Sequence, residues 1–468
     1  MNRQQRWTLA LTSLAALMVG LDALVVTTAL NTIRVHLGAS IAELEWTVNA
    51  YTLTFAMLLL TASTIGDRIG RRRLLTYGLT VFTAASAACA LSPSISALIA
   101  ARAVQGAGAA MVMPAALSLV GAAFGAEQRG RAMGIFAGII GLAILGGPVV
   151  GGAVVQGVAW QWIFWLNVPI GLMLIPLIGR QITETAGPGG KLDIIGLVLS
   201  GLGVLGLVFG LVQGNTAGWT SPEVAGTLAG GTALLIAFVC WELRAPAPML
   251  PMRLFANRMF SAGNLAGLLM TGAIYSAVFF FAQYLQAGLH ESPLISGLRL
   301  LPWTATLFVI APIAGARINQ FGERRLIVAG LLAQAAGFAW IAMASNASYP
   351  AMVAPMMLAG TGVSMAMPAA QNAVLGAVPL SEIGTASGIY NSMRQLGATL
   401  GIAVVSAVFT AHGSYASTAA VSRGFSAAML VGAAISALGG LAGLGIARHH
   451  RLVAACEPVP APVESLSA

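Results

Sequence analysis

Long apolar runs alternate with short polar segments along the chain. About fourteen runs of roughly 20 apolar residues can be drawn, and this length lets a helix cross the hydrocarbon core of a bilayer. The first run extends from Trp7 to Leu30 and the second from Trp46 to Ile65. The in-and-out alternation of a transmembrane β-barrel is absent from the runs. The pattern therefore predicts an all-α polytopic membrane protein with fourteen transmembrane helices.

An internal repeat divides the chain. Residues 106–116 read GAGAAMVMPAA and residues 360–370 read GTGVSMAMPAA. Helices rich in small residues resemble one another because they pack closely, but Met-x-Met-Pro-Ala-Ala is not a general packing pattern. A half-length repeat in a membrane protein is typical of transporters built from two related halves. We predict two six-helix bundles, over 1–180 and 256–450, with two extra central helices and their flanking loops over 181–255.

Composition and the placement of charge support a membrane location. Hydrophobic residues make up 58% of the chain and charged residues 8%, whereas a soluble domain carries about 25% charged residues. Most basic residues fall in loops on the side of the amino terminus, and only Arg34, Arg299 and Arg423 fall in loops on the other side. Because basic loops stay in the cytoplasm, we predict a multi-pass protein of the bacterial cytoplasmic membrane with both termini cytoplasmic. The net charge of +9 then reflects topology and does not indicate nucleic acid. We expect a monomer with a disordered cytoplasmic tail over 451–468.

The loop between the second and third runs resembles the signature loop of the major facilitator superfamily. Residues 66–73 read GDRIGRRR. Gly70 allows a tight turn between two helices, and Asp67 can pair with a basic neighbour or lie at a helix amino end. Arg68 and Arg71 hold the loop on the cytoplasmic side. A loop that is merely basic is the alternative explanation of this stretch.

Further stretches resemble motifs of one branch of this superfamily, the fourteen-helix drug–proton antiporters. They begin at Arg102 (RAVQGAG), Gly147 (GPVVGG), Trp160 (WQWIFWLNVPIG) and Arg394 (RQLG), and the first span contains the family's Leu-Asp at Asp22. The resemblance covers both halves and implies the major facilitator fold and proton-driven drug export. The chain departs from the family patterns at Leu24, Thr27, Thr28, Asn31, Ser63 and Ala143.

Asp22 is expected to be the only acidic residue well inside a predicted span. An ionised carboxylate at the centre of a bilayer costs about 2.5–3.5 kcal/mol on insertion scales, so it needs a proton or a cationic partner. Arg102, in a span of the same half, is the natural partner. We predict that Asp22 carries the coupling proton and that Arg102 tunes its pKa. The alternative is a static buried ion pair.

The fifth predicted span is rich in glycine. Gly147, Gly151 and Gly152 allow tight packing, and Pro148 leaves one backbone carbonyl without its usual partner. The resemblance implies a bendable helix that seals the cavity of an exchanger against leak. Close helix packing alone is the alternative explanation.

Polar side chains in or near the spans form the candidate substrate cavity. Any one such side chain more often packs in the core or faces lipid than lines a cavity. Methionines in the same spans could supply an adaptable apolar wall. Arg394 is less easily explained by packing, because a charge inside a span either receives an anionic group of the substrate or anchors a helix. The predicted cavity residues are Asn49, Tyr51, Tyr275, Gln283, Gln371, Asn372, Asn391 and Arg394.

These features predict a proton-coupled antiporter that exports amphipathic small molecules, such as drugs or antibiotics, by alternating access. Export of a dedicated metabolite or a lipid-like substrate is the alternative, and the glycine-rich fifth span argues against uptake symport. A membrane-embedded enzyme is the competing class, but no phosphate-binding glycine loop, HExxH or nucleophile elbow stands out. The histidines and cysteines have no metal-ligand spacing, so we expect no metal and no cofactor beyond the proton gradient.

Overall fold

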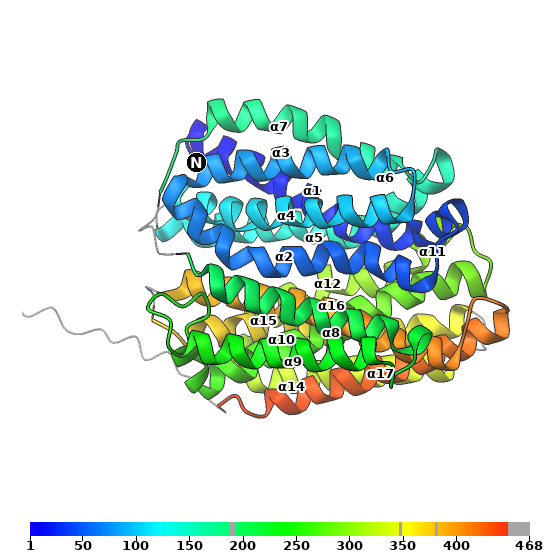
Figure 1. Cartoon of the computed structure of the whole chain (residues 1–468). Coiled ribbons are helices and arrows are strands. Elements are labelled where there is room, and N and C mark those ends of the chain that lie inside the picture. Colours follow the sequence, from blue (N-terminus) through cyan, green and yellow to red (C-terminus); the bar gives the residue numbers. More distant parts are fainter. Residues whose placement is uncertain (125, 187–191, 346–348, 380–381, 448–468) are drawn as a thin grey trace, which may run out of the picture.

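The computed structural model describes residues 1–124, 126–186, 192–345, 349–379 and 382–447, and every regular element within these ranges is helical (Figure 1). This confirms the predicted all-α class. The predicted tail over 451–468 lies outside the described residues. In chain order the elements are α1 (Arg3–Leu37), α2 (Ile41–Ile69), α3 (Arg71–Ala90), α4 (Ile95–Ala123), α5 (Ala126–Gly157), α6 (Trp162–Trp165), α7 (Asn167–Gln181), α8 (Ile194–Ala217), α9 (Pro222–Glu242), η1 (Met252–Ala256), α10 (Arg258–Gln283), η2 (Tyr284–Gly288), α11 (Pro293–Arg299), α12 (Leu301–Ala316), α13 (Ile318–Phe321), α14 (Glu323–Met343), α15 (Tyr349–Gly376), α16 (Ile383–His412) and α17 (Thr418–Gly443).

Thirteen helical stretches of the described chain are long and apolar enough to cross a membrane. Three of these stretches join two elements each, namely α6 with α7, α10 with η2, and α11 with α12. The 20-residue helix α3 is not among the thirteen, because its first turn consists of Arg71, Arg72 and Arg73. With α3 included, the described chain contains the fourteen helical rods that the apolar runs predict.

Capping side chains set where the helices begin, and one of them corrects a predicted boundary. The Glu43 amide donates to Ser40 Oγ at 3.3 Å, and the Ser40 amide donates to Glu43 Oε2 at 2.8 Å, which is a capping box. The helix α2 therefore begins at Ile41, more than one turn before the predicted start at Trp46. The earlier start brings Glu45 inside the helix.

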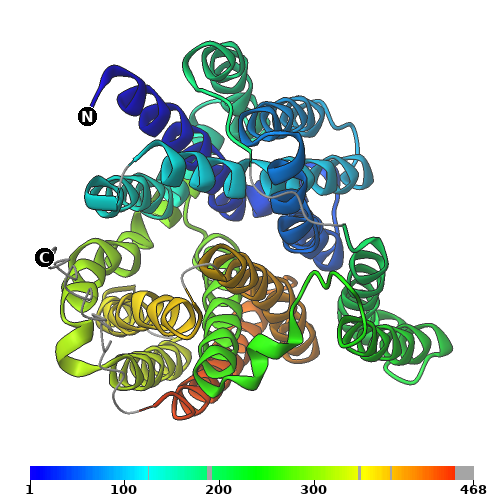
Figure 2. The same ribbon diagram turned by 90° about the vertical axis from the view of Figure 1, so that its left-hand side faces the viewer.

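The rods form two bundles that lie side by side (Figure 2). Helices α1 to α7 make the amino-terminal bundle and α10 to α17 make the carboxy-terminal bundle. The two extra helices, α8 and α9, pack against each other beside the junction of the two bundles. There α8 contacts α2 of one bundle and α16 of the other. The predicted boundary after residue 180 falls in the last turn of α7, and the predicted boundary after residue 255 falls within η1, between α9 and α10.

The two copies of the repeat occupy equivalent places in the two bundles. Gly106 of α4 lies against the backbone of Tyr51 in α2, and Gly360 of α15 lies against the backbone of Trp303 in α12. A Cβ at either glycine would overlap that backbone. The small residues that define the repeat are thus found where two helices of each bundle approach closely.

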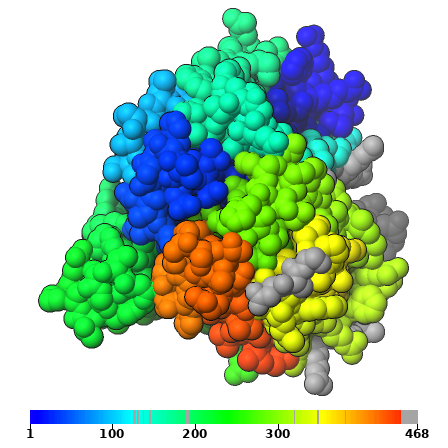
Figure 3. All heavy atoms as spheres, turned by 90° about the vertical axis from the view of Figure 1, so that its right-hand side faces the viewer, coloured from blue at the N-terminus to red at the C-terminus, as the bar shows by residue number. Residues whose placement is uncertain are grey.

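The two ends of the molecule differ in charge and in how the bundles meet. The end that holds the start of α1 and the 66–73 loop is named the basic face here, and the other end is named the opposite face. At the opposite face α5 packs against α11, and α2 crosses α16, so each pair joins one bundle to the other. Figure 3 looks at the opposite face and shows segments of both bundles packed together. Described arginines at the basic face are Arg3, Arg6, Arg68, Arg71, Arg72, Arg73, Arg180, Arg244, Arg253, Arg258, Arg317, Arg324 and Arg325.

Candidate functional site

Asp22 lies near the middle of α1 and is 2% exposed. Its carboxylate accepts three hydrogen bonds: from Arg102 Nη1 to Oδ2 at 2.5 Å, and to Oδ1 from Gln105 Nε2 at 2.8 Å and Asn167 Nδ2 at 2.9 Å. The donors come from α4 and α7, so the network joins three helices of the amino-terminal bundle. The structure therefore brings the two predicted residues, Asp22 and Arg102, into direct contact.

Arg102 is held from several sides. Its Nε donates to the carbonyl of Thr47 at 3.1 Å, and its Nη1 also donates to Gln105 Oε1 at 2.7 Å. The Tyr51 ring lies 4.2 Å from the guanidinium carbon and the Phe164 ring lies 5.8 Å from it. Aromatic faces attract a guanidinium most strongly where water is absent. These contacts fix the arginine in place, and they provide partners for a charged side chain that is only 1% exposed.

The donors around Asp22 tie its carboxylate to the packing of neighbouring helices. Gln105 Nε2 and Asn167 Nδ2 also donate to Ser86 Oγ of α3, at 2.7 and 3.3 Å. Within the described residues, the hydrogen bonds to the Asp22 carboxylate all come from N–H groups, and they occupy three of its about four acceptor positions. A proton on this carboxyl group would compete with those donors for the same two oxygens.

Two members of this network were within the quoted motifs but had no predicted role. Gln105 follows Arg102 by three residues, which places both on the same face of α4. Asn167 is the first residue of α7. The available signal was an amide side chain in an apolar span, since a buried amide needs partners. The partners themselves lie in helices far apart in the sequence.

A second buried carboxyl group corrects the prediction that Asp22 is the only acid well inside a span. Glu45 lies in the second turn of α2 and is 1% exposed. Ser406 of α16 donates a hydrogen bond to its Oε1, and its Oε2 has no hydrogen-bond partner among the described residues. The prediction was wrong because the second run was drawn from Trp46, which left this acid in a loop.

Four of the predicted cavity residues are Tyr51, which borders the Asp22 network, and Tyr275, Asn391 and Arg394 of the carboxy-terminal bundle. Tyr51 packs on Arg102, and Tyr275 of α10 is half-buried and within electrostatic reach of both Tyr51 and Arg394. The guanidinium carbon of Arg394 in α16 lies 5.8 Å from the Tyr390 ring. Asn391, one turn along α16, donates to the carbonyl of Ser387 at 3.0 Å. Within the described chain Arg394 forms no hydrogen bond or ion pair, and its Nε is buried.

The other four predicted cavity residues are dispersed. Asn49 and Gln283 are buried, and the polar atoms of both side chains lack a hydrogen-bond partner in the part of the chain that is described. Gln371 and Asn372 are exposed on α15, near its end at the basic face. Asn372 Nδ2 donates to Glu323 Oε1 at 2.8 Å at the start of α14. The structure therefore does not gather all eight residues around one point.

The 66–73 loop makes a compact turn at the basic face. Arg71 Nη2 lies 2.8 Å from Asp67 Oδ1, and Arg68 is exposed. Gly70 has φ 106°, a conformation that favours glycine. The carboxylate of Glu184, from the segment after α7, accepts the amides of Arg72 and Arg73 at 2.9 and 3.3 Å, so it caps the first turn of α3. Glu184 was not among the predicted residues.

The glycine-proline stretch of α5 lies between the two bundles. A Cβ at Gly147 would lie 2.7 Å from Leu24 Cβ of α1, and Gly151 lies against Val25 of α1 in the same way. A Cβ at Gly152 would overlap the backbone of Pro293 in α11, and the backbone of Pro148 lies against Gly297, also in α11. The stretch therefore forms a contact between the bundles at the opposite face.

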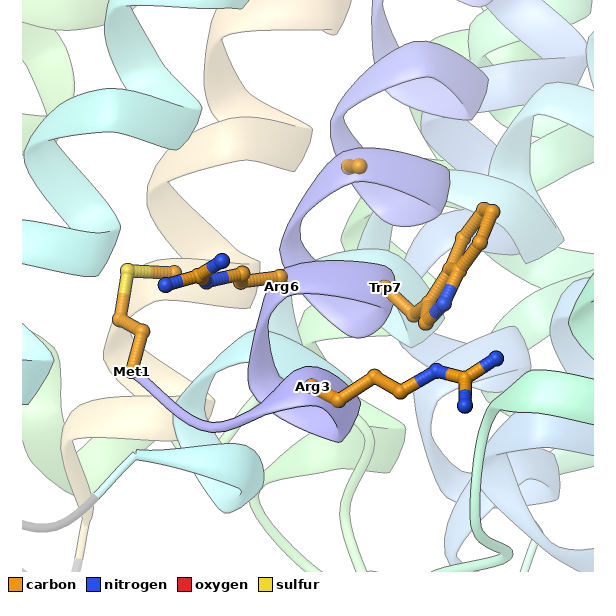
Figure 4. A pocket seen from close by; sticks show the side chains of 5 residues that line it. Met1, Arg3, Arg6 and Trp7 are labelled. Atoms are coloured by element: carbon orange, nitrogen blue, oxygen red, sulfur yellow. The ribbon is translucent and has the colours of Figure 1, made fainter.

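A surface hollow of about 490 Å³ lies at the start of α1, lined by Met1, Arg3, Arg6, Trp7 and Ala10 (Figure 4). It is at the basic face, many helical turns from Asp22. Arginine with tryptophan at a helix end is typical of an anchor at the membrane interface. The hollow is therefore not included in the candidate site. Among the described residues no group of three or more His, Cys, Asp or Glu side chains is arranged to hold a metal ion.

Comparison with known proteins places this geometry in a family. The family model described as Major Facilitator Superfamily matches residues 12–402 and, separately, residues 263–452. The chain is 32% identical over 416 residues to the multidrug resistance protein Stp of Mycobacterium tuberculosis strain H37Rv, covering 88% of this chain and 77% of that protein. It is 32% identical over 445 residues to a methylenomycin A resistance protein of Bacillus subtilis strain 168, with 94% of each chain covered.

Two further comparisons agree. The tetracenomycin C resistance and export protein of Streptomyces glaucescens is 32% identical over 408 residues, covering 86% of this chain and 76% of that protein. A crystal structure of a peptide transporter POT in complex with sulfate superposes with a TM-score of 0.68 over 94% of this chain and 95% of that one, at 16% identity. At that identity the structural match supports the fold alone.

Proposed function

Because this chain belongs to the major facilitator superfamily, we propose that it exports amphipathic small molecules in exchange for protons and that Asp22 carries the coupling proton. The observation that carries this proposal is the buried 2.5 Å contact between Asp22 and Arg102. Relatives named for multidrug resistance, methylenomycin A resistance and tetracenomycin C export favour drug-like compounds as the substrate class. The resistance and export for which these relatives are named also favour export over uptake.

The proposed cycle follows from the hydrogen bonds of Asp22. In the described arrangement the carboxylate accepts three N–H donors, which suits the proton-free form, and the bundles meet at the opposite face. Once that face has opened and the substrate has left, a proton that enters from it would compete with a donor of α4 or α7, and Arg102 would then be free to shift. Movement of these helices relative to α1 would change which face is closed. Proton and substrate would thereby take turns, which is the requirement for antiport.

The site of action is part of the same proposal. The arginines of the basic face favour a cytoplasmic location for that face and for the amino terminus, in a bacterial cytoplasmic membrane. The glycine-proline contact between α5 and α11 would seal the opposite face while the substrate is taken up. We propose that a single chain suffices, since both bundles of the cycle are present in it.

The experiment uses the purified protein in lipid vesicles with an imposed pH difference and a panel of antibiotics and amphipathic dyes. We expect wild type to accumulate at least one compound against its gradient and a protonophore to abolish this. Asp22→Asn should abolish accumulation yet retain exchange of labelled for unlabelled substrate at equal pH, because substrate binding does not require the carboxylate.

The matched control is Glu223→Gln, which removes an exposed acid from the first turn of α9. It should accumulate substrate like wild type. Gradient-driven accumulation that survives Asp22→Asn would refute the coupling role. Failure with the whole panel, together with transport of one metabolite, would favour the dedicated exporter instead.

A further inference from the structure

Glu45 joins the two bundles at the opposite face. It belongs to α2 of the amino-terminal bundle, and its one side-chain hydrogen-bond partner among the described residues, Ser406, belongs to α16 of the carboxy-terminal bundle. Thr52 and Thr399, farther along the same two helices, form a second contact, with 2.8 Å between their hydroxyl oxygens. The carboxyl group is therefore buried by the meeting of two bodies that must separate if this face is ever to open.

The surroundings of Glu45 suit a neutral carboxyl group. Ser406 supplies a single donor, and Oε2 lies in a buried place with no hydrogen-bond partner within the described residues. A buried carboxylate oxygen without a donor loses its hydration and gains nothing in return. A proton on the carboxyl group removes the charge and with it most of that cost. Separation of the bundles would instead expose the group to water, where it would ionise.

The charged neighbours do not neutralise Glu45. Beyond α16, the Tyr415 ring lies 4.8 Å from the Arg34 guanidinium carbon. Burial and the charge of Glu45 raise the pKa of the Tyr415 hydroxyl, whereas Arg34 lowers it. No ion pair between Arg34 and Glu45 is present in the described chain, and Arg34 Nη2 instead donates to Asn31 at 3.3 Å.

The remaining elements packed on α2 also leave Glu45 without a counter-ion. From α4, Arg102 contacts the Thr47 carbonyl but directs its guanidinium to Asp22 of α1. The helix α8 has no charged residue, and the arginines of α3 lie at the basic face. His36 at the end of α1 packs on Trp160, and the exposed His412 of α16 contacts its own helix at the Val408 carbonyl.

We propose that Glu45 is a second proton-binding site, separate from Asp22, whose protonated form holds the opposite face closed. When the bundles part, the proton passes from the carboxyl group to water on that face, and the carboxylate that remains resists reclosure. Acid on the opposite side would then favour closure and alkali would favour opening. The inference rests on the proposed function only in that the bundles must separate at this face.

The test is a distance measurement that does not depend on transport. Spin labels are placed at Leu91 and Met343, which are 69% and 83% exposed and lie at the opposite face in different bundles. Cys240 and Cys456 are replaced by serine, and Asp22→Asn is included so that Asp22 cannot titrate. We expect the ratio of separated to closed molecules to rise about tenfold or more from acidic to alkaline buffer, as one linked proton requires.

Glu45→Gln should abolish this pH response. The control Glu43→Gln removes an acid two residues away and keeps the capping box, because glutamine also serves at that position, and it should leave the response unchanged. Ser406→Ala should raise the separated population about fivefold at every pH, as loss of one hydrogen bond predicts, without removing the response. A pH response that survives Glu45→Gln would overturn the proposal, whereas the role of Asp22 is decided separately by the vesicle experiment.

Discussion

Asp22 and Glu45 are both buried carboxyl groups on adjacent helices, yet their surroundings are opposite. Asp22 accepts three N–H donors, including a guanidinium, and all of them belong to its own bundle. Glu45 has one hydroxyl donor, which belongs to the other bundle, and its second oxygen has no hydrogen-bond partner among the described residues. The number of donors suggests which protonation state each site holds. The donors of Asp22 belong to its own bundle, so Asp22 responds to movement of helices within that bundle. The donor of Glu45 belongs to the other bundle, so Glu45 responds to separation of the two bundles.

The largest effect is expected from removing the cation of the first site. Arg102→Met leaves Asp22 buried with amide donors only, and breaking one partner of a buried ion pair costs about 3–5 kcal/mol. We expect a marked fall in the thermal unfolding temperature of the purified protein. The double variant Asp22→Asn with Arg102→Met removes both charges and should recover most of the lost stability. If the double variant is as unstable as Arg102→Met, the charge balance is not what holds this site together.

An intermediate effect is expected where the bundles touch. A methyl group at Gly152 would overlap the Pro293 backbone of α11, so Gly152→Ala should prevent full closure of the opposite face. We expect exchange in vesicles to slow about tenfold, with a measurable proton leak. Gly146→Ala in the same helix meets no atom within 4 Å and provides the control. Equal rates for the two variants would contradict a sealing role for this stretch.

The smallest effect is expected from removing one neutral donor of Asp22. Asn167→Ala takes away one of the three hydrogen bonds, and a hydrogen bond to a charged group contributes about 1.5–3 kcal/mol of which water can replace part. The carboxylate loses stabilisation relative to its protonated form, so the pH profile of exchange should move to higher pH by about one unit. Glu45→Gln should not move the profile in this way. An unchanged profile in Asn167→Ala would mean that Asn167 only fills space.

The sequence was sufficient to predict the fold and the contact between Asp22 and Arg102. Apolar runs and a half-length repeat specify helices and two bundles, and a lone aspartate in an apolar span requires a partner such as Arg102. Glu45 was missed because its helix was predicted to begin at Trp46, although the Ser40 and Glu43 capping box marks an earlier start. Its partner Ser406 is 361 residues away, and no local pattern reports such a contact. Dispersal of the predicted cavity residues has the same origin, since polarity in a span does not reveal which way a side chain faces.

Antiport by this chain requires that substrate binding and proton binding at Asp22 exclude each other. The direct measurement adds a transported compound to purified protein in weakly buffered detergent solution and follows pH with a dye. Wild type and Glu45→Gln should each release about one proton per molecule on binding substrate near the midpoint of the pH profile, whereas Asp22→Asn should release none. Proton release by Asp22→Asn equal to that of wild type would contradict the coupling role of Asp22.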